Sequence, residues 1–307
     1  MLPDFPHFYK LKIEDKELYE NSTAGYPPFS DILFATLHIW WNLGEQLAVA
    51  SLNGNVVIRY HLPFDAKSSG YCLVGEEKID ESILAIFDYL KERGEPRKLV
   101  HVPEFVVNAI NNKDNFKLKE EPDYQEYILD SKGLAELPGH PYGHIRTQVN
   151  RFLREVEGRK VEIKSLDLSV LDNQDHLFNA ILEWEKSHPS RNDPQRTEHD
   201  ALKKTLSHAA ALDIENLSLY VDDKLQGVIL YHQPHTKDHF VIHHLRFDYS
   251  IPYTSDFMTR HLAREAMRRN VPYINMEMDL GSENLRRHKM KLNPVHFFRK
   301  YTIKPEH

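Results

Sequence analysis

Hydrophobic and polar residues alternate along short segments in the first part of the chain, a pattern that predicts half-buried β-strands. Asn53-Gly54 joins two of these segments and is the strongest short signal for a type I′ hairpin. A helical pattern follows, in which apolar residues recur every three to four positions from Asp80 until Gly94 ends the helix. The strands are expected at residues 46–51, 55–61, 71–74, 99–102 and 127–129, with a short helix from Pro103 before the last one.

The second part of the chain repeats this order of elements. Strand, turn, strand, strand, helix, strand, helix and strand occur twice, which indicates a duplicated unit. Helices are also expected before each copy, at residues 30–41, 174–188 and 198–212, and between the copies at residues 142–156. The second set of strands is expected at residues 217–221, 227–233, 240–247, 273–276 and 295–303, with a turn at Asp222-Asp223, a helix from Ser255 and a short helix near residues 284–292.

We therefore predict an α/β protein with two tandem halves, residues 1–135 and 136–307, of which the second is catalytic. No segment is apolar over a length that could span a bilayer, and the first 20 residues lack the apolar core of a secretory signal. Cys72 is the only cysteine, which fits a reducing compartment. The sequence thus favours a soluble, cytoplasmic protein.

The formal net charge of −7 disfavours general adhesion to nucleic acid, so tRNA or phosphate would have to bind a local basic surface. Residues 284–304 contain no Asp or Glu and are expected to form one. A weaker basic stretch, residues 146–164, is also typical of an ordinary solvated helix face. The basic residues of the first stretch are Arg286, Arg287, Lys289, Lys291, Arg299, Lys300 and Lys304.

Two longer motifs carry a family resemblance. The first is YILDSKGLAELPG at residues 127–139 with HIRTQVNRF at residues 144–152. The second is YINMEMDLG at residues 273–281, followed by LRRHK at 285–289, NP at 293–294 and KYTI at 300–303. Together they resemble the family similar to the C-terminal, tandem acyltransferase (GNAT) domain of phosphatidylglycerol lysyltransferase, over nearly the whole chain.

This resemblance implies two tandem GNAT-like, mixed-sheet halves and the transfer of an acyl group. In the named relatives an aminoacyl group moves from aminoacyl-tRNA to a lipid hydroxyl, so tRNA is the implied partner and a lipid or small molecule the implied acceptor. The chain departs from the family pattern before Asn150, where His144, Ile145, Arg146 and Thr147 replace the usual basic pair. Arg146 is kept among the expected substrate-binding residues.

Acyl transfer needs oriented reactants, a route for the acceptor's proton and donors aimed at the developing oxyanion. Glu277 and Asp279 share one face if the predicted strand extends that far, at the end of the sheet where open α/β folds bind ligands. Arg286 and Lys289, three positions apart on the next helix, would hold phosphate or oppose Asp279. We therefore expect Asp279 and Arg286 to be catalytic and Glu277 and Lys289 to bind substrate. A structural salt bridge from Asp279 to Arg286 explains the same pattern, so both interpretations remain open.

His244 and Arg246 alternate onto one face of the predicted strand at residues 240–247, opposite His243. His244 is the expected base and Arg246 an expected substrate contact, although an interior histidine with a structural role is the competing interpretation. His239 and His243 would lie about 13 Å apart along the strand, too far to share a metal ion. We expect no metal site.

The loop before the helix predicted from Ser255 bears on whether the acyl donor is acyl-CoA or aminoacyl-tRNA. Acyl-CoA enzymes of this fold hold pyrophosphate on a glycine-rich turn, whereas residues 248–256 contain no glycine and two acids. The sequence therefore favours aminoacyl-tRNA over acyl-CoA as donor, with Tyr253 lining the donor channel. Acyl-CoA-dependent N- or O-acylation and a non-catalytic binding module remain as alternatives.

Overall fold

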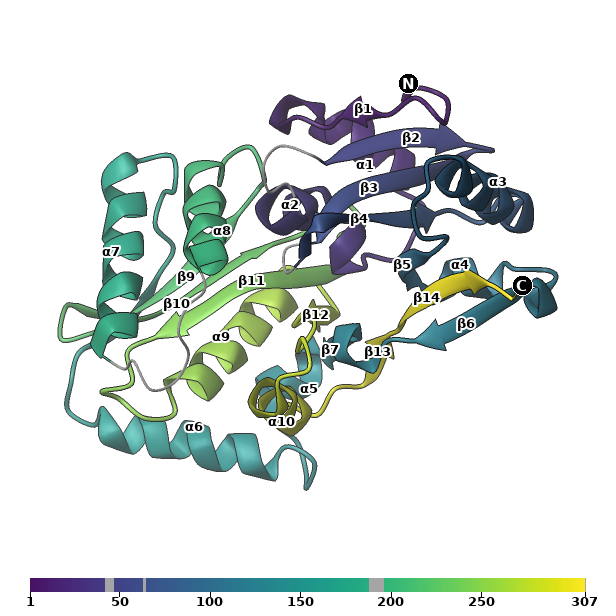
Figure 1. Ribbon diagram of the computed structural model, residues 1–307. Coiled ribbons are helices and arrows are strands. Elements are labelled where there is room, and N and C mark those ends of the chain that lie inside the picture. The colour runs from purple at the N-terminus through teal and green to yellow at the C-terminus, as the bar shows by residue number, and fades with distance from the viewer. Residues whose placement is uncertain (42–46, 63–64, 188–195, 307) are drawn as a thin grey trace. The chain divides into compact units, whose positions relative to one another are not determined.

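The computed structural model describes residues 1–41, 47–62, 65–187 and 196–306 (Figure 1). The chain divides into two compact units, each assembled from segments that are far apart in the sequence. The first holds Met1–Glu126, Met278–Ser282 and Phe297–His307, and the second holds Tyr127–Glu277 and Glu283–His296. The division at residues 135 and 136, which separates two copies along the chain, stays a prediction.

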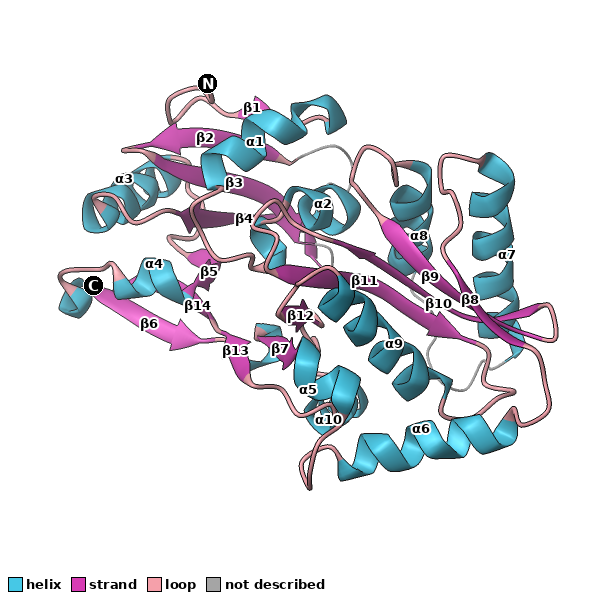
Figure 2. Cartoon of the chain, turned by 180° about the vertical axis from the view of Figure 1, so that it is seen from behind, coloured by secondary structure: helices cyan, strands magenta, loops and turns pink. Residues whose placement is uncertain are grey.

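The first unit contains two antiparallel sheets, of order β1-β2-β3-β4 and β5-β14-β6 (Figure 2). Its strands are β1 (Tyr9–Lys10), β2 (Ala48–Leu52), β3 (Asn55–Leu62), β4 (Asp65–Val74), β5 (Leu99–Pro103), β6 (Phe116–Glu120) and β14 (Lys300–Pro305). Its helices are α1 (Lys16–Thr23), α2 (Phe34–Thr36), α3 (Ile79–Glu92) and α4 (Glu104–Asn108).

A continuous apolar core joins the two sheets of the first unit. Helix α3 places Ile83, Ile86 and Phe87 on its buried face, at the spacing that the helical pattern predicts. These side chains belong to one cluster with Val57 of β3 and Leu99 of β5. Burial of this face therefore holds α3 against strands of both sheets.

The second unit is built on a seven-stranded mixed sheet of order β13-β7-β12-β11-β10-β9-β8 (Figure 1). Strand β12 runs parallel to β11 and antiparallel to β7. The strands are β7 (Glu126–Asp130), β8 (Val161–Lys164), β9 (Glu215–Val221), β10 (Lys224–His232), β11 (His239–Phe247), β12 (Tyr273–Asn275) and β13 (His296–Phe298). The helices are α5 (Ser131–Glu136), α6 (Gly143–Glu155), α7 (Leu171–Ser187), α8 (Arg196–Ser207), α9 (Thr254–Arg268) and α10 (Glu283–Lys291).

Gly227 of β10 allows helix α9 to lie close to the sheet. A Cβ atom at this position would collide with the sulfur of Met258 and come within 3.2 Å of the Thr254 methyl carbon, and both residues belong to α9. The absence of a side chain at Gly227 therefore fixes the first turns of α9 against β10.

The predicted hairpin turns are confirmed. Asn53 and Gly54 have φ values of 53° and 85°, and Asp222 and Asp223 have φ values of 51° and 63°. Positive φ at both central residues is the requirement of a type I′ turn, which matches the twist of the paired strands. Asn, Asp and Gly tolerate this conformation better than other residues.

The predicted repeat is present, because β2, β3, β4, α3, β5 and α4 recur in order as β9, β10, β11, α9, β12 and α10. The final strands are exchanged between the copies. Strand β7 pairs with β12, whereas the C-terminal strand β14 pairs with β5 and β6. The prediction of one strand at residues 295–303 was wrong, because this segment divides into β13 and β14, which join different sheets.

The helix predicted at residues 30–41 is a succession of short turns of different pitch, with Phe34–Thr36 alone α-helical. The other predicted helices agree with α3, α6, α7, α8, α9 and α10 to within a few residues. Two predicted ends, residue 46 of the first strand and residue 188 of one helix, lie outside the described residues.

Candidate active site

Strands β11 and β12 of the second unit diverge. They pair from His239 to Val241, after which β11 continues to Phe247 while β12 ends at Asn275. The chain then turns through Glu277, whose φ is 56°. The predicted strand face shared by Glu277 and Asp279 is therefore wrong, since the strand stops before both. Beyond Val241, this edge of β11 has no strand paired to it within the described residues, and side chains line it instead.

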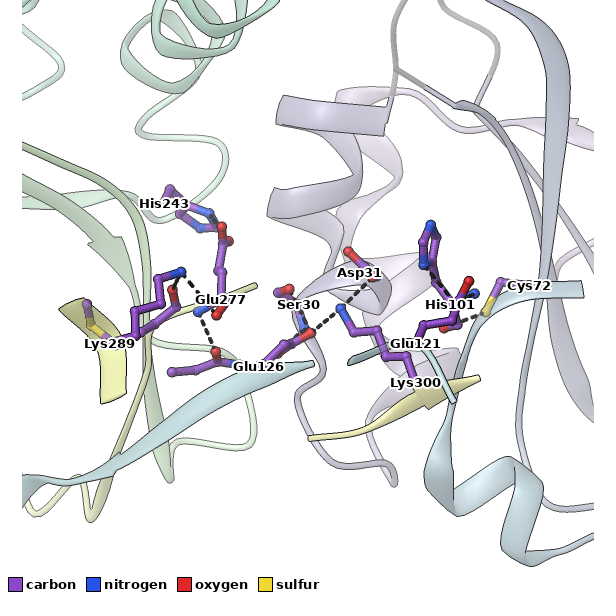
Figure 3. Close-up of polar contacts among 12 residues, drawn as sticks. Ser30, Asp31, Cys72, His101, Glu121, Glu126, His243, Glu277, Lys289 and Lys300 are labelled. Atoms are coloured by element: carbon purple, nitrogen blue, oxygen red, sulfur yellow. Dashed lines mark hydrogen bonds and ion pairs between the residues drawn. The ribbon is translucent and has the colours of Figure 1, made fainter. Parts of the chain in front are cut away.

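Three ionisable side chains form a continuous row at this divergence, which we call the relay: Glu277, His243 and His232. The Glu277 Oε1 atom lies 3.1 Å from Nδ1 of His243 (Figure 3). Nε2 of His243 lies 2.8 Å from Nδ1 of His232. The two imidazole planes differ by 14°. The His243 side chain has no exposed surface, and that of Glu277 is 13% exposed. A buried carboxylate–imidazole–imidazole row is an arrangement that can hold and direct a proton.

Lys289 of α10 fixes the turn that carries Glu277. Its Nζ atom donates to the carbonyl oxygens of Met276 at 2.7 Å and Glu277 at 3.2 Å (Figure 3). The Asn275 side chain accepts a hydrogen bond from the Glu277 backbone N–H at 2.8 Å. The ammonium also lies 5.7 Å from the centre of the Tyr127 ring. Lys289 is only 8% exposed, so the predicted role as a surface phosphate ligand does not fit its position.

His244 and Arg246 share a face of β11, as predicted, and both approach α8. The Thr205 hydroxyl lies 2.9 Å from Nε2 of His244, and burial together with the positive charge of Arg246 holds the pKa of His244 well below its usual value. The Arg246 guanidinium lies 3.8 Å from a Glu185 oxygen and 3.7 Å from a Glu198 oxygen. A fully buried imidazole that resists protonation argues against the predicted base role of His244.

Asp279 and Arg286 belong to different units. Asp279 is fully buried, and its Oδ1 atom accepts a hydrogen bond from the Gly281 N–H at 2.8 Å while its carbonyl accepts one from the Ser282 N–H at 2.9 Å. Arg286 is half-buried on α10. Asp279 thus stabilises the turn before α10, and the catalytic roles predicted for Asp279 and Arg286 stay predictions.

The remaining predicted contacts have partners within the second unit. Tyr253 precedes α9 with φ of 67°, and the Arg151 guanidinium carbon lies 5.6 Å from the centre of its ring. Arg146 donates from Nη1 to the carbonyl oxygens of Leu137 at 2.7 Å and Gly139 at 3.0 Å. Arg146 therefore stabilises the loop before α6, and its predicted substrate contact stays a prediction.

In the first unit, the corresponding strands β4 and β5 belong to separate sheets, and aromatic side chains pack there. The His101 ring lies 4.2 Å from the Tyr124 ring and 5.5 Å from the Trp41 ring, centre to centre. Burial raises the pKa of the neighbouring Cys72 thiol far above its usual value, which makes this cysteine a poor nucleophile (Figure 3). Aromatic rings thus pack between β4 and β5 of the first unit, at the position where the second unit has the relay.

Glu121 connects strands β5 and β14 in this part of the first unit. Its carboxylate lies 3.3 Å from Nδ1 of His101 and accepts a hydrogen bond from the Thr302 hydroxyl at 2.7 Å. Burial alone would raise the pKa of Glu121, but the bonds from His101 and Thr302 outweigh it and lower the pKa. Glu121 is therefore an ionised carboxylate that binds β5 to β14.

The basic surface predicted at residues 284–304 is much reduced in the structure. Lys300 has no exposed surface and lies 2.5 Å from an Asp31 oxygen and 2.6 Å from a Glu126 oxygen (Figure 3). Lys289 is buried in the turn described above. Arg287 and Arg299 lie 3.7 Å from glutamate oxygens. Sequence alone does not distinguish a buried, paired lysine from an exposed one. The number of basic residues in this segment therefore overestimated the exposed basic surface.

The described residues contain no helix long and apolar enough to cross a membrane. Within the same residues, no group of three or more His, Cys, Asp and Glu side chains is arranged to hold a metal ion.

The sequence matches the profile of the family described as phosphatidylglycerol lysyltransferase, C-terminal, over residues 38–304. The chain belongs to this family. No curated protein matches the sequence. Family membership and the fold together support acyltransferase activity.

Solved structures share the fold of this family member at low identity. A conserved protein of unknown function from Bacteroides thetaiotaomicron is 21% identical, with a TM-score of 0.82 and 100% of both chains covered. L-PGS from Bacillus licheniformis is 14% identical, with a TM-score of 0.63, 100% of this chain and 94% of that chain covered. A tandem GNAT protein from the clavulanic acid biosynthesis pathway is 8% identical, with a TM-score of 0.50 and coverages of 96% and 97%. The protein therefore has two tandem GNAT-like halves. The sheet of the second unit is mixed, as predicted, whereas the two sheets of the first unit are antiparallel, so the prediction of a mixed sheet was wrong for the first half.

Proposed function

We propose that this protein transfers an aminoacyl group from aminoacyl-tRNA to a hydroxyl or amine of a lipid or small molecule. The relay at the divergence of β11 and β12 carries the proposal, because it places a proton acceptor where the sheet of the second unit opens. Membership of a lysyltransferase family supports an aminoacyl group as the transferred group.

The reaction balances without a further co-reactant. The acceptor oxygen or nitrogen attacks the ester carbonyl carbon, so a C–O or C–N bond forms and the bond to the ribose oxygen of tRNA breaks. The proton lost by the acceptor passes to a base and then to the departing ribose oxygen. The protein must therefore supply one group that accepts and returns a proton.

Transfer from acyl-CoA is the alternative reaction on the same fold. A helix N-terminus binds pyrophosphate through free backbone N–H groups. In the loop before α9, the Asp248 carboxylate accepts a hydrogen bond from the Ser250 N–H at 2.9 Å, and Asp256 adds a second acid in the first helical turn. In the first unit, the Glu77 N–H is bonded to the Asn55 side chain at 3.0 Å. Because these loops carry acidic side chains and N–H groups that already donate to side chains, they disfavour pyrophosphate binding and support a donor other than CoA.

Arg246, Tyr253 and Arg286 remain proposed substrate contacts. Arg246 is about one-third exposed between two glutamates, which leaves part of its guanidinium open to a ligand. Arg286 is the basic residue of α10 that the proposal assigns to a tRNA phosphate, because arginine binds phosphate with two N–H groups at once.

Donor binding should separate the two reactions. We expect charged tRNA, at a concentration 100 times its dissociation constant, to stabilise the folded protein by about 2.7 kcal/mol and so to raise its unfolding temperature. Acetyl-CoA should have no effect. Differential scanning fluorimetry of the full chain measures both, with uncharged tRNA as the control for non-specific adhesion. Stabilisation by acetyl-CoA alone would replace the proposal with acyl-CoA transfer, and no response to either ligand would favour a binding module.

A further inference from the structure

The relay has one end that reaches solvent. The Glu277 side chain is 13% exposed, whereas the His243 side chain has no exposed surface and His232 is 4% exposed. An acceptor molecule can meet the carboxylate, but it can meet neither imidazole without displacing packed side chains. We propose that Glu277 is the catalytic base of the second unit and that His243 and His232 are positioning residues. This inference rests on the proposed acyl transfer.

The hydrogen-bond geometry assigns the protons along the relay. An ionised carboxylate accepts only, so Nδ1 of His243 must carry the proton in the 3.1 Å contact with Oε1 of Glu277. In the neutral tautomer of His243 that carries this proton, Nε2 is an acceptor, and His232 then donates from Nδ1 across the 2.8 Å contact. Both imidazoles are neutral in this assignment. Their N–H bonds all point toward Glu277, which leaves Oε2 as the oxygen that meets the acceptor.

The backbone conformation of Glu277 indicates that the surrounding residues hold its side chain in a fixed direction. A φ of 56° is unfavourable for a residue with a long side chain, so the surrounding contacts must hold it there. The Asn275 side chain and the Lys289 ammonium bind the N–H and the two carbonyls of this turn. Four contacts therefore hold the carboxylate in place. Three of them bind the backbone of the turn, one to the Asn275 side chain and two from Lys289, and the fourth joins the carboxylate to His243.

The chemical step follows from this geometry. Oε2 of Glu277 takes the proton of the acceptor hydroxyl or amine as the acceptor atom bonds to the ester carbonyl carbon. When the bond to the ribose oxygen breaks, Glu277 gives the same proton to that oxygen. His243 and His232 keep their protons throughout, and their role is to hold Oε1 so that Oε2 faces the acceptor.

Single-turnover transfer from charged tRNA tests the order of the roles. We expect Glu277→Gln to lower the rate of transfer about 10²–10⁴-fold, the usual contribution of a general base. His243→Phe should cost less, and His232→Phe least, because each is one contact further from the acceptor. His243→Asn should recover part of the loss of His243→Phe, because its amide can replace the Nδ1–H donor. His176→Gln, an exposed histidine of α7, is the matched control and should keep full activity.

A second measurement needs no substrate. In ¹⁵N-resolved spectra of imidazole, we expect His243 to be neutral and protonated at Nδ1 in the wild-type protein and to change tautomer populations in Glu277→Gln. Activity retained in Glu277→Gln would overturn the base role alone. A greater loss in His243→Phe than in Glu277→Gln would make His243 the base. No transfer by a wild-type protein whose spectra show the relay would reject the proposed function itself.

Discussion

Lys300→Met should lower the free energy of unfolding by about 3–5 kcal/mol, the cost of removing one partner from a buried ion pair. Lys300 and Glu126 have no exposed surface and Asp31 is 3% exposed, so the two carboxylates would lose their counter-charge inside the protein. The Ser30 N–H and hydroxyl, which donate to Glu126 at 2.8–3.0 Å, cannot replace a full positive charge. Urea unfolding followed by circular dichroism measures the change.

The control lies on the same strand. Lys304 is exposed on β14, and Lys304→Met should change the unfolding free energy by less than about 0.5 kcal/mol. Replacing all three charges, in Lys300→Met with Asp31→Asn and Glu126→Gln, should recover much of the lost stability because no unpaired charge remains. Equal effects of Lys300→Met and Lys304→Met would show that the buried cluster contributes little.

Lys289→Met should impair both stability and transfer. The carbonyls of Met276 and Glu277 would lose their charged donor, which costs about 1–3 kcal/mol when the groups stay buried. The turn at Glu277 would relax, and a displacement of about 1 Å at a reacting group can lower a rate about 100-fold. Unfolding experiments and single-turnover transfer on the same preparation measure the two effects.

Lys291→Met is the matched control, because Lys291 is exposed on the same helix and carries the same charge. It should leave both quantities nearly unchanged. If Lys289→Met were stable but bound charged tRNA less tightly at an unchanged rate of transfer, Lys289 would be a substrate ligand, as the sequence first indicated, and not a support for Glu277.

The fold was largely predictable because its local signals are strong. The Asn53-Gly54 and Asp222-Asp223 turns require positive φ, and the 3.6-residue period of α3 marks a single buried face. The exchange of β7 and β14 was not predictable, since the pattern of residues along a strand does not say which sheet it joins. The short turns at residues 30–41 were mistaken for a helix because their apolar residues are buried on all sides.

The site was predictable only in part. The sequence placed Glu277 near the chemistry and His244 and Arg246 on one face of β11. It missed His243 and His232, because their contact depends on the antiparallel pairing of β10 with β11, in which Tyr231 faces Ile242 after a register shift. The available signal was that the two histidines lie on strands predicted one after the other along the chain, at residues 227–233 and 240–247. Burial of Lys289 likewise depends on where α10 packs, which no local pattern reports.

The most direct test of aminoacyl transfer by the second unit is movement of label from tRNA. The full chain is incubated with tRNA charged with radiolabelled amino acids and with a total extract of lipids and small metabolites. We predict that label enters an acceptor in this extract with the wild-type protein and with Cys72→Ala, and that Glu277→Gln abolishes it. Label that stays on tRNA when the wild-type protein is folded would contradict the account, as would a parallel reaction in which label enters the extract from radiolabelled acetyl-CoA instead.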